Sequence, residues 1–162
     1  MVRHFGNTNE TPKVNGSLAE NGCGKFADIN DAALISLRKL GITHLWLTGI
    51  LEQASSTAYP ERPADSPLLL KGKAGSPYAI RDYFDVCPDY ATDPTKRLDE
   101  FKALLKRIKK RGLKTIIDFV PNHVARSYSS DIRPELSFGR NDDTGKFFDL
   151  DNNFYYLGDL HP

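Results

Sequence analysis

The sequence predicts an α/β fold in which helices alternate with parallel strands, and three observations support this prediction. First, one unit of helix, glycine and strand occurs twice, because residues 37–42 and residues 108–113 share the same pattern of apolar, basic and glycine positions. Second, an apolar run follows each unit, as in strands covered on both faces. Third, the helix-to-strand turns take one or two residues, whereas about forty residues follow each strand. This alternation implies an α/β sheet or barrel.

The first predicted helix lies between Asp28 and Gly41. Asp28 is a suitable N-cap, and Gly41 fits the position after a helix where the backbone becomes left-handed. Apolar residues recur at helical spacing: Ile29, Ala33, Leu37 and Leu40. Residues 1–26 are rich in Asn, Gly, Thr and Glu, so we expect an irregular arm in which only residues 2–5 could end a strand.

Residues 42–47 form the first predicted strand and residues 115–120 the second. Prolines and glycines interrupt residues 48–92, which cannot form one regular element, and loops this long are usually functional. Asp93 then caps a second helix with Pro94 at its first position, and Gly112 ends it. The apolar face of this helix contains Leu98, Phe101, Leu105 and Ile108.

Length and composition indicate one globular domain, with 162 residues, 40% of them hydrophobic. The net charge of +1 gives no long-range field that would attract nucleic acid or a membrane surface. The basic run 106–111 lies on the solvent side of the second predicted helix, so we expect no nucleic-acid partner. The chain has no apolar run long enough to span a bilayer and no signal peptide at its start, which predicts a soluble protein of undetermined compartment.

Cysteines and histidines give little support for a metal centre. Cys23 and Cys87 have no CxxC spacing, which excludes a zinc ribbon and leaves two thiols, which we favour, or one long-loop disulfide. The histidines show no paired spacing typical of zinc ligands. We expect His44, inside the first strand, to be packed in the core.

Polar residues gather where the second predicted strand ends. Asp118 lies within the apolar run, and Asn122 and His123 follow directly after Pro121. An unpaired buried carboxylate is costly, so we expect Asp118 to have hydrogen-bonding partners, with Asn122 and His123 the nearest candidates. A strand-end aspartate that caps a turn is the alternative. In (β/α) barrels this end of the strands carries the active site.

Four stretches, in order, resemble the α-amylase superfamily of retaining glycoside hydrolases and transglycosidases. Residues 118–123, Asp-Phe-Val-Pro-Asn-His, resemble the family's first signature at the end of the third barrel strand. Residues 40–50 are similar to the segment that enters its second strand, and residues 78–92 to the loop after that strand. The stretch from Ser137 to Tyr156 resembles the opening of its inserted B domain.

This resemblance implies roles for five residues. Tyr78 would stack on the sugar at the cleavage subsite, and His123 would donate a hydrogen bond to a sugar hydroxyl there. Asp118 would be the carboxylate that orders the site, together with Asp82. Asn122 would occupy the position that ligates a structural calcium ion in many members, and amide oxygens suit that cation.

The resemblance also implies an architecture and an activity. We expect residues 1–121 to form the first strands and helices of an incomplete (β/α)8 TIM barrel, and residues 122–162 to begin the B domain. A full barrel takes about 250 residues, so the remainder of the barrel would be a partner of this chain. The expected substrate is an α-glucan, namely starch or a maltooligosaccharide.

Retaining glycosidases need two carboxyl groups about 5–5.5 Å apart, and the family's motifs that carry them are not found in this sequence. We therefore expect a fragment of a hydrolase that is inactive by itself. Alternatives are a transglycosylase or sugar phosphorylase on the same scaffold, and a non-catalytic carbohydrate-binding protein.

Overall fold

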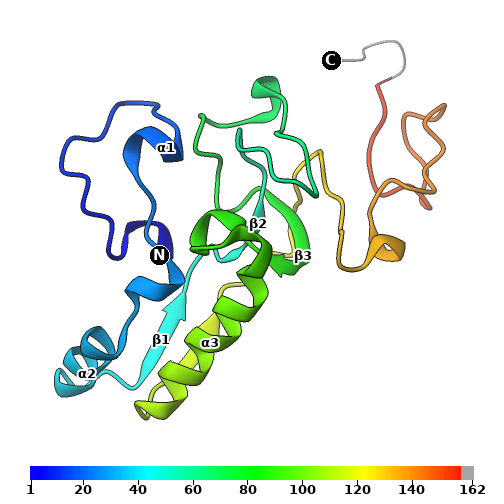
Figure 1. Ribbon diagram of the computed structural model, residues 1–162. Coiled ribbons are helices and arrows are strands. Elements are labelled where there is room, and N and C mark those ends of the chain that lie inside the picture. The colour runs from blue at the N-terminus through cyan, green and yellow to red at the C-terminus, as the bar shows by residue number, and fades with distance from the viewer. Residues whose placement is uncertain (158–162) are drawn as a thin grey trace.

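The structure is a computed structural model that describes residues 1–157 (Figure 1). Its α-helices are α1 (Leu18–Asn21), α2 (Asp31–Lys39) and α3 (Arg97–Lys110). Its strands are β1 (His44–Leu47), β2 (Leu51–Gln53), β3 (Ile80–Val86) and β4 (Lys114–Ile117). Figure 1 shows the long helix α3 running beside β1, while the segment after β4 leads away from the helices.

The strands β1 and β4 form a parallel pair, as the repeated helix-glycine-strand unit predicts. Their register aligns Leu45 with Thr115 and Trp46 with Ile116. Successive side chains of a strand point to opposite faces, and in β1 the face with Leu47 is buried whereas Trp46 is 63% exposed. The expectation of strands covered on both faces is therefore wrong for the described residues, because the helices pack against only one side of this pair.

Both predicted helices form, with small shifts at their ends. The N-cap of α2 is Asn30, whose side chain accepts a hydrogen bond from Ala33 N–H, and Asp28 instead closes the preceding 3-10 turn Phe26–Asp28. Leu40 lies past the end of α2 and is exposed. Asp93 caps a 3-10 turn, Pro94–Lys96, that leads directly into α3. After the helices, Gly41 and Gly112 adopt φ values of +86° and +71°, as expected for left-handed positions.

A second sheet lies inside the stretch that the sequence marks as a long loop. The strands β2 and β3 pair antiparallel, with Glu52 opposite Asp82, and the ladder is irregular on both sides of Glu52. Charged and polar residues that alternate with proline and glycine obscured this hairpin in the sequence. It gives the described part of the chain two small sheets of two strands each.

The N-terminal segment differs from one of the predictions. Residues 2–5 do not end a strand, because Val2–His4 form a 3-10 turn in which Phe5 N–H donates to the carbonyl of Val2. The short helix α1 has a capping box in which Ser17 and Glu20 bond each other's backbone N–H groups. His44, expected in the core, is exposed on the open face of β1. Cys23 and Cys87 are free thiols, as predicted.

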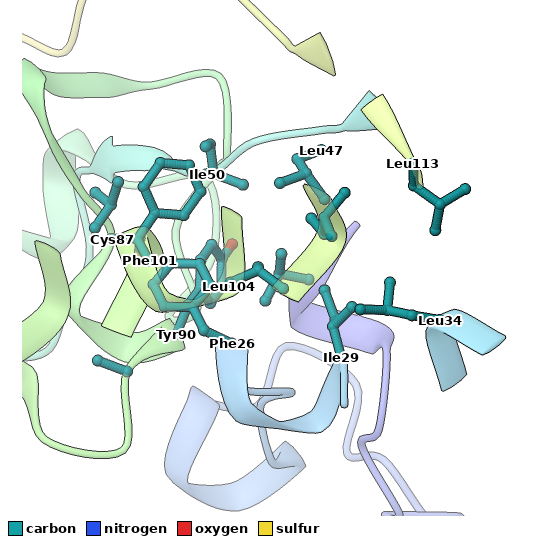
Figure 2. Close-up of a cluster of buried hydrophobic side chains, with 14 residues drawn as sticks. Phe26, Ile29, Leu34, Leu47, Ile50, Cys87, Tyr90, Phe101, Leu104 and Leu113 are labelled. Atoms are coloured by element: carbon teal, nitrogen blue, oxygen red, sulfur yellow. The ribbon is translucent and has the colours of Figure 1, made fainter. Parts of the chain in front are cut away.

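The hydrophobic core joins the N-terminal segment, α2, β1 and α3 (Figure 2). Phe26 contacts two aromatic rings, with centroid distances of 6.0 Å to Tyr90 and 5.4 Å to Phe101. Leu104 of α3 has no exposed surface and lies at the centre of the cluster in Figure 2. This core fixes α3 beside β4 and so positions the segment after β4.

Residues 122–157 contain the short 3-10 turn Pro134–Leu136 and otherwise consist of turns and loops. The predicted B-domain segment, 122–162, thus has no strand or α-helix in its described portion, and its last five residues lie outside the described range. Within residues 1–157 no helix combines the length and the apolar character needed to cross a membrane.

Candidate functional site

An aromatic-lined cleft lies just beyond the end of β4. Its volume is about 580 Å³, and it is bounded by the loop after β4 and by the C-terminal segment. The residues that line it are Tyr83, Phe119, Pro121, Asn122, His123, Val124, Phe138, Asn153 and Phe154. Apolar and aromatic walls with a few polar groups are typical of sites for small ligands.

The structure brings together two of the five predicted site residues, because the exposed side chains of Asn122 and His123 both line this cleft. Tyr78 is 41% exposed in the turn before β3 and is not among the cleft-lining residues. Asp118 is half-buried, and its backbone N–H donates to the carbonyl of Leu47 at 3.3 Å. No hydrogen bond joins the Asp118 carboxylate to Asn122 or His123 in the described residues, contrary to our expectation. Asp82 is fully buried and lies apart from the cleft lining.

Tyr83 is the main residue of the cleft that sequence reasoning missed. Its hydroxyl lies 2.6 Å from the carbonyl of Val120, to which it donates, and 3.4 Å from the carbonyl of His123. Burial raises the pKa of Tyr83, so the hydroxyl stays protonated and remains a donor. Its ring contacts Phe119 and Tyr128 with centroid distances of 5.5 and 5.7 Å. Tyr83 therefore ties β3 to the loop that carries His123.

Backbone hydrogen bonds hold the same loop against the free edge of β3. Ala125 N–H donates to the carbonyl of Ile80 at 2.7 Å, and Ser129 N–H donates to the carbonyl of Arg81 at 3.0 Å. The stacked rings of Tyr128 and Phe138, 4.3 Å apart, extend the contact toward the C-terminal segment. The His123 loop is thus fixed by main-chain bonds as well as by side-chain packing.

Asp142 organises the C-terminal wall of the cleft. Its carboxylate accepts hydrogen bonds from the N–H groups of Asn153 and Phe154, both at 2.9 Å, and from the Tyr156 hydroxyl at 3.0 Å. Burial acts to raise the pKa of Asp142, but these hydrogen bonds outweigh it and the pKa is lowered. The Arg126 guanidinium lies 5.2 Å from the ring centroids of both Phe154 and Tyr156. These contacts position Asn153 and Phe154 at the cleft.

A buried network of charges connects β2, β3 and the start of α3. Arg62 contacts Glu52 at 3.0 Å, Arg81 contacts Asp65 at 3.0 Å, and all four side chains are at most 10% exposed. Arg97, at the start of α3, contacts Asp85, Glu61 and Asp131 at 2.6, 2.5 and 2.9 Å. Burial is the main cause that raises the pKa of Glu52, to about 7, and of Asp85.

The described residues offer Asn122 no complete calcium shell. A calcium ion takes six to eight oxygen ligands, typically including carboxylates, and no Asp or Glu lines the cleft beside Asn122 in residues 1–157. Within the same range, one group of three close carboxylates occurs, Glu52, Asp82 and Asp131, and it does not include Asn122.

Comparisons with known proteins give a consistent result. Residues 5–144 match the family model "Alpha amylase, catalytic domain". The chain is 36% identical over 83 residues to Maltase 1 of Drosophila virilis and 30% identical over 128 residues to Pullulanase A of Streptococcus pneumoniae. These matches cover 51% and 76% of this chain, but only 10% and 9% of the two relatives.

A solved structure agrees with the sequence matches. The crystal structure of an α-amylase from Lactobacillus plantarum superposes with a TM-score of 0.52 at 31% identity, and the match covers 78% of this chain and 26% of the amylase chain. The chain therefore spans about a quarter or less of the length of these similar proteins.

Proposed function

The chain belongs to the α-amylase family, whose catalytic domain is a (β/α)8 barrel, and from this premise we propose that it supplies one sugar-binding edge of a glycosidase that acts on α-glucans. The matched family model over residues 5–144 is the basis of the premise.

The observation that carries the proposal is the position of His123 and Asn122 in an aromatic-lined cleft. They follow β4, a parallel strand, so they lie at the strand end where barrel enzymes bind their substrates. Phe119, 64% exposed, offers an aromatic face for the apolar face of a sugar ring, and His123 and Asn122 offer hydrogen bonds to hydroxyl groups. This combination suits a neutral carbohydrate better than a charged ligand.

We further propose that the chain alone lacks the catalytic carboxylates. No Asp or Glu lines the cleft in residues 1–157. Glu52 and Asp82 have carboxylate oxygens within 4.8 Å of each other, but both side chains are buried and neither lines the cleft. A sugar in the cleft would therefore meet no nucleophile and no general acid from these residues.

The open face of the parallel pair supports a role for the remainder of a barrel as a partner. Trp46 and Ile116, which are in register, expose 63% and 41% of their surface there. Ile117, on the other face of β4, is 44% exposed. Leu47, in contrast, is buried in the hydrophobic core, and Leu45 is half-buried. Further barrel strands would cover the exposed residues. A structural calcium ion at Asn122 also remains a proposal, and it requires ligands beyond those that the described residues place there.

Calorimetric titration with maltoheptaose tests the sugar-binding proposal. We expect a dissociation constant on the order of millimolar, since part of a site gives weak affinity. Replacing His123 with Ala removes one hydrogen bond and weakens binding about fivefold, whereas the exposed His44→Ala on the opposite strand end serves as the unchanged control. No binding at a maltoheptaose concentration about 20-fold above the expected dissociation constant would contradict the proposal. Equal binding of the β-linked cellohexaose would contradict it as well.

Assays of reducing-sugar release test the proposed lack of activity. The isolated chain should release no sugar from maltoheptaose above the rate of a buffer blank. Turnover near that of ordinary enzymes, roughly 1 per second or faster, would show that the chain contains its own catalytic carboxylates.

A further inference from the structure

We propose that Glu52, Asp82 and Asp131 bind a divalent cation of the calcium class, at a site separate from the sugar cleft. Glu52 belongs to β2, Asp82 to β3, and Asp131 to the segment after β4. The site would therefore join three parts of the chain that are distant in sequence. The inference does not depend on the sugar-binding proposal.

The spacing of the three carboxylates fits a calcium ion. Each residue offers one oxygen, and these oxygens lie within 4.8 Å of one another. Calcium–oxygen distances are about 2.3–2.6 Å, so two oxygens on opposite sides of the ion are separated by roughly 4.6–5.2 Å. Magnesium, with distances of about 2.0–2.1 Å, requires its ligands to be closer together. Water can complete the shell on the exposed side, where Asp131 lies.

An unpartnered oxygen points to a missing ligand. Asp82 has no exposed surface, and its Oδ1 accepts a hydrogen bond from Phe84 N–H at 2.7 Å. Its Oδ2 is buried and has no hydrogen-bond partner in the described residues. The Ser130 hydroxyl also acts to lower the pKa of Asp82, although no hydrogen bond of ordinary geometry joins the two side chains. A buried carboxylate oxygen without a donor is costly unless a cation or a proton satisfies it.

The strand pairing adds a second, independent reason. Glu52 stands directly opposite Asp82 in the ladder between β2 and β3, and the two residues are 2% and 0% exposed. Like charges opposite each other in a sheet are destabilising, and burial strengthens the repulsion. A cation between the two strands would convert this repulsion into two favourable contacts.

The neighbouring arginines do not neutralise the cluster. Three guanidinium groups, those of Arg62, Arg81 and Arg97, contact five carboxylates: Glu52, Glu61, Asp65, Asp85 and Asp131. Asp82 is a sixth, so carboxyl groups outnumber guanidinium groups by three. The arginine contacts of Glu52 go to Oε1 and that of Asp131 goes to Oδ2. Each of these two side chains therefore keeps its second oxygen for an ion.

The exposed member of the site, Asp131, lies at a pocket that is open to solvent. Asp131, whose side chain is 36% exposed, lines a pocket of about 420 Å³ together with Asp85, Arg97 and residues of α3. An ion in this pocket would meet Asp131, and one oxygen of Asp131 lies within 4.8 Å of an oxygen of each of the two buried carboxylates. Once bound, it would connect the β2–β3 hairpin to the segment after β4, which also carries His123.

Equilibrium dialysis with radioactive calcium tests the proposal on the 162-residue chain after removal of metal ions with a chelating resin. We expect one ion that depends on Asp82, with a dissociation constant of about 1 mM or tighter. Asp82→Asn and Asp131→Asn should each weaken this binding at least tenfold. Glu10→Gln, which changes an exposed carboxylate of the N-terminal segment, and Asn122→Ala should both retain the Asp82-dependent ion. A tenfold excess of magnesium should displace less than half of it.

Several results would overturn the proposal. One is the absence of any bound calcium at 10 mM. Greater stability of Asp82→Asn than of the unchanged chain would then show that a proton satisfies the carboxylates. Another is loss of calcium in Asn122→Ala but not in Asp131→Asn. Should Asp82→Asn fail to fold, the exposed Asp131→Asn decides, since unchanged calcium binding in that variant contradicts the assignment.

Discussion

Replacing Arg97 with Met tests how the chain holds its hairpin, its long helix and the segment after β4 together. Arg97 is 6% exposed and is the first residue of α3. Its guanidinium lies 2.6 Å from Asp85 and 2.9 Å from Asp131. Methionine approximates the volume of the aliphatic part of the arginine side chain. It leaves Asp85, whose side chain has no exposed surface, without a cation.

The structure allows an estimate of the cost. Removing one partner of a buried ion pair costs about 3–5 kcal/mol, because the remaining charge stays buried without compensation. A domain of this size has a total stability of about 5–15 kcal/mol. We therefore expect Arg97→Met to lose about a fifth or more of the free energy of unfolding, measured by urea denaturation with circular dichroism.

Two controls separate this mechanism from a general effect of the substitution. Lys102→Met changes an exposed side chain on the same helix, 4.0 Å from Asp99, and should alter stability by less than about 0.5 kcal/mol. Adding Asp85→Asn to Arg97→Met removes the uncompensated charge and should restore about 1–3 kcal/mol. A loss below about 1 kcal/mol in Arg97→Met, or no restoration in the double variant, would refute the reasoning.

Three further predictions follow from individual contacts. Tyr83→Phe removes the hydrogen bond to Val120, so it should lower the free energy of unfolding by about 1 kcal/mol and weaken maltoheptaose binding. Unchanged affinity for maltoheptaose would argue against a role of Tyr83 in holding the His123 loop. Leu104→Ala should cost about 2–5 kcal/mol in urea denaturation, because Leu104 is fully buried in the core. Burial raises the pKa of Cys23 to about 11, so its thiolate fraction at pH 8 should be about 100-fold below that of an ordinary thiol. The rate of alkylation by iodoacetamide should be lower by the same factor and should still rise at pH 10. A plateau of this rate near pH 9 would contradict the buried environment.

The helices and the parallel pair could be predicted because their signals are local. Gly41 and Gly112 mark the helix ends by a backbone conformation that favours glycine. The apolar runs after them identify β1 and β4, whose pairing follows from the alternation of elements. The N-cap at Asn30 was missed because Asp28, two residues earlier, is an equally good capping residue.

The hairpin and the charge network could not be predicted, since they depend on contacts between distant residues. Glu52 and Asp82 are thirty positions apart, and no sequence pattern indicates that they face each other in a buried ladder. Tyr83 could have been suspected only as the residue beside Asp82, because its partner Val120 is a backbone carbonyl without a sequence signal. Val2–His4 form a local turn, which an apolar run of this length does not distinguish from a strand end.

The cleft was partly predictable. His123 and Asn122 follow an apolar run that predicts a strand, and that position alone indicated a site. The opposite wall, with Asn153 and Phe154, depends on the hydrogen bonds of Asp142 and could not be inferred from residue order. Asp118 does not line the cleft although the next residue, Phe119, does, because successive side chains of an extended chain point to opposite sides.

The most direct test of the central claim is a map of amide chemical shifts during titration of the isotope-labelled chain with maltotriose. The account predicts that the shifts that change with sugar concentration cluster at Phe119, Asn122, His123 and Phe154, and that cellotriose leaves them unchanged. Shift changes confined to residues far from this cleft, or identical changes with both sugars, would contradict the assignment of the cleft as an α-glucan site.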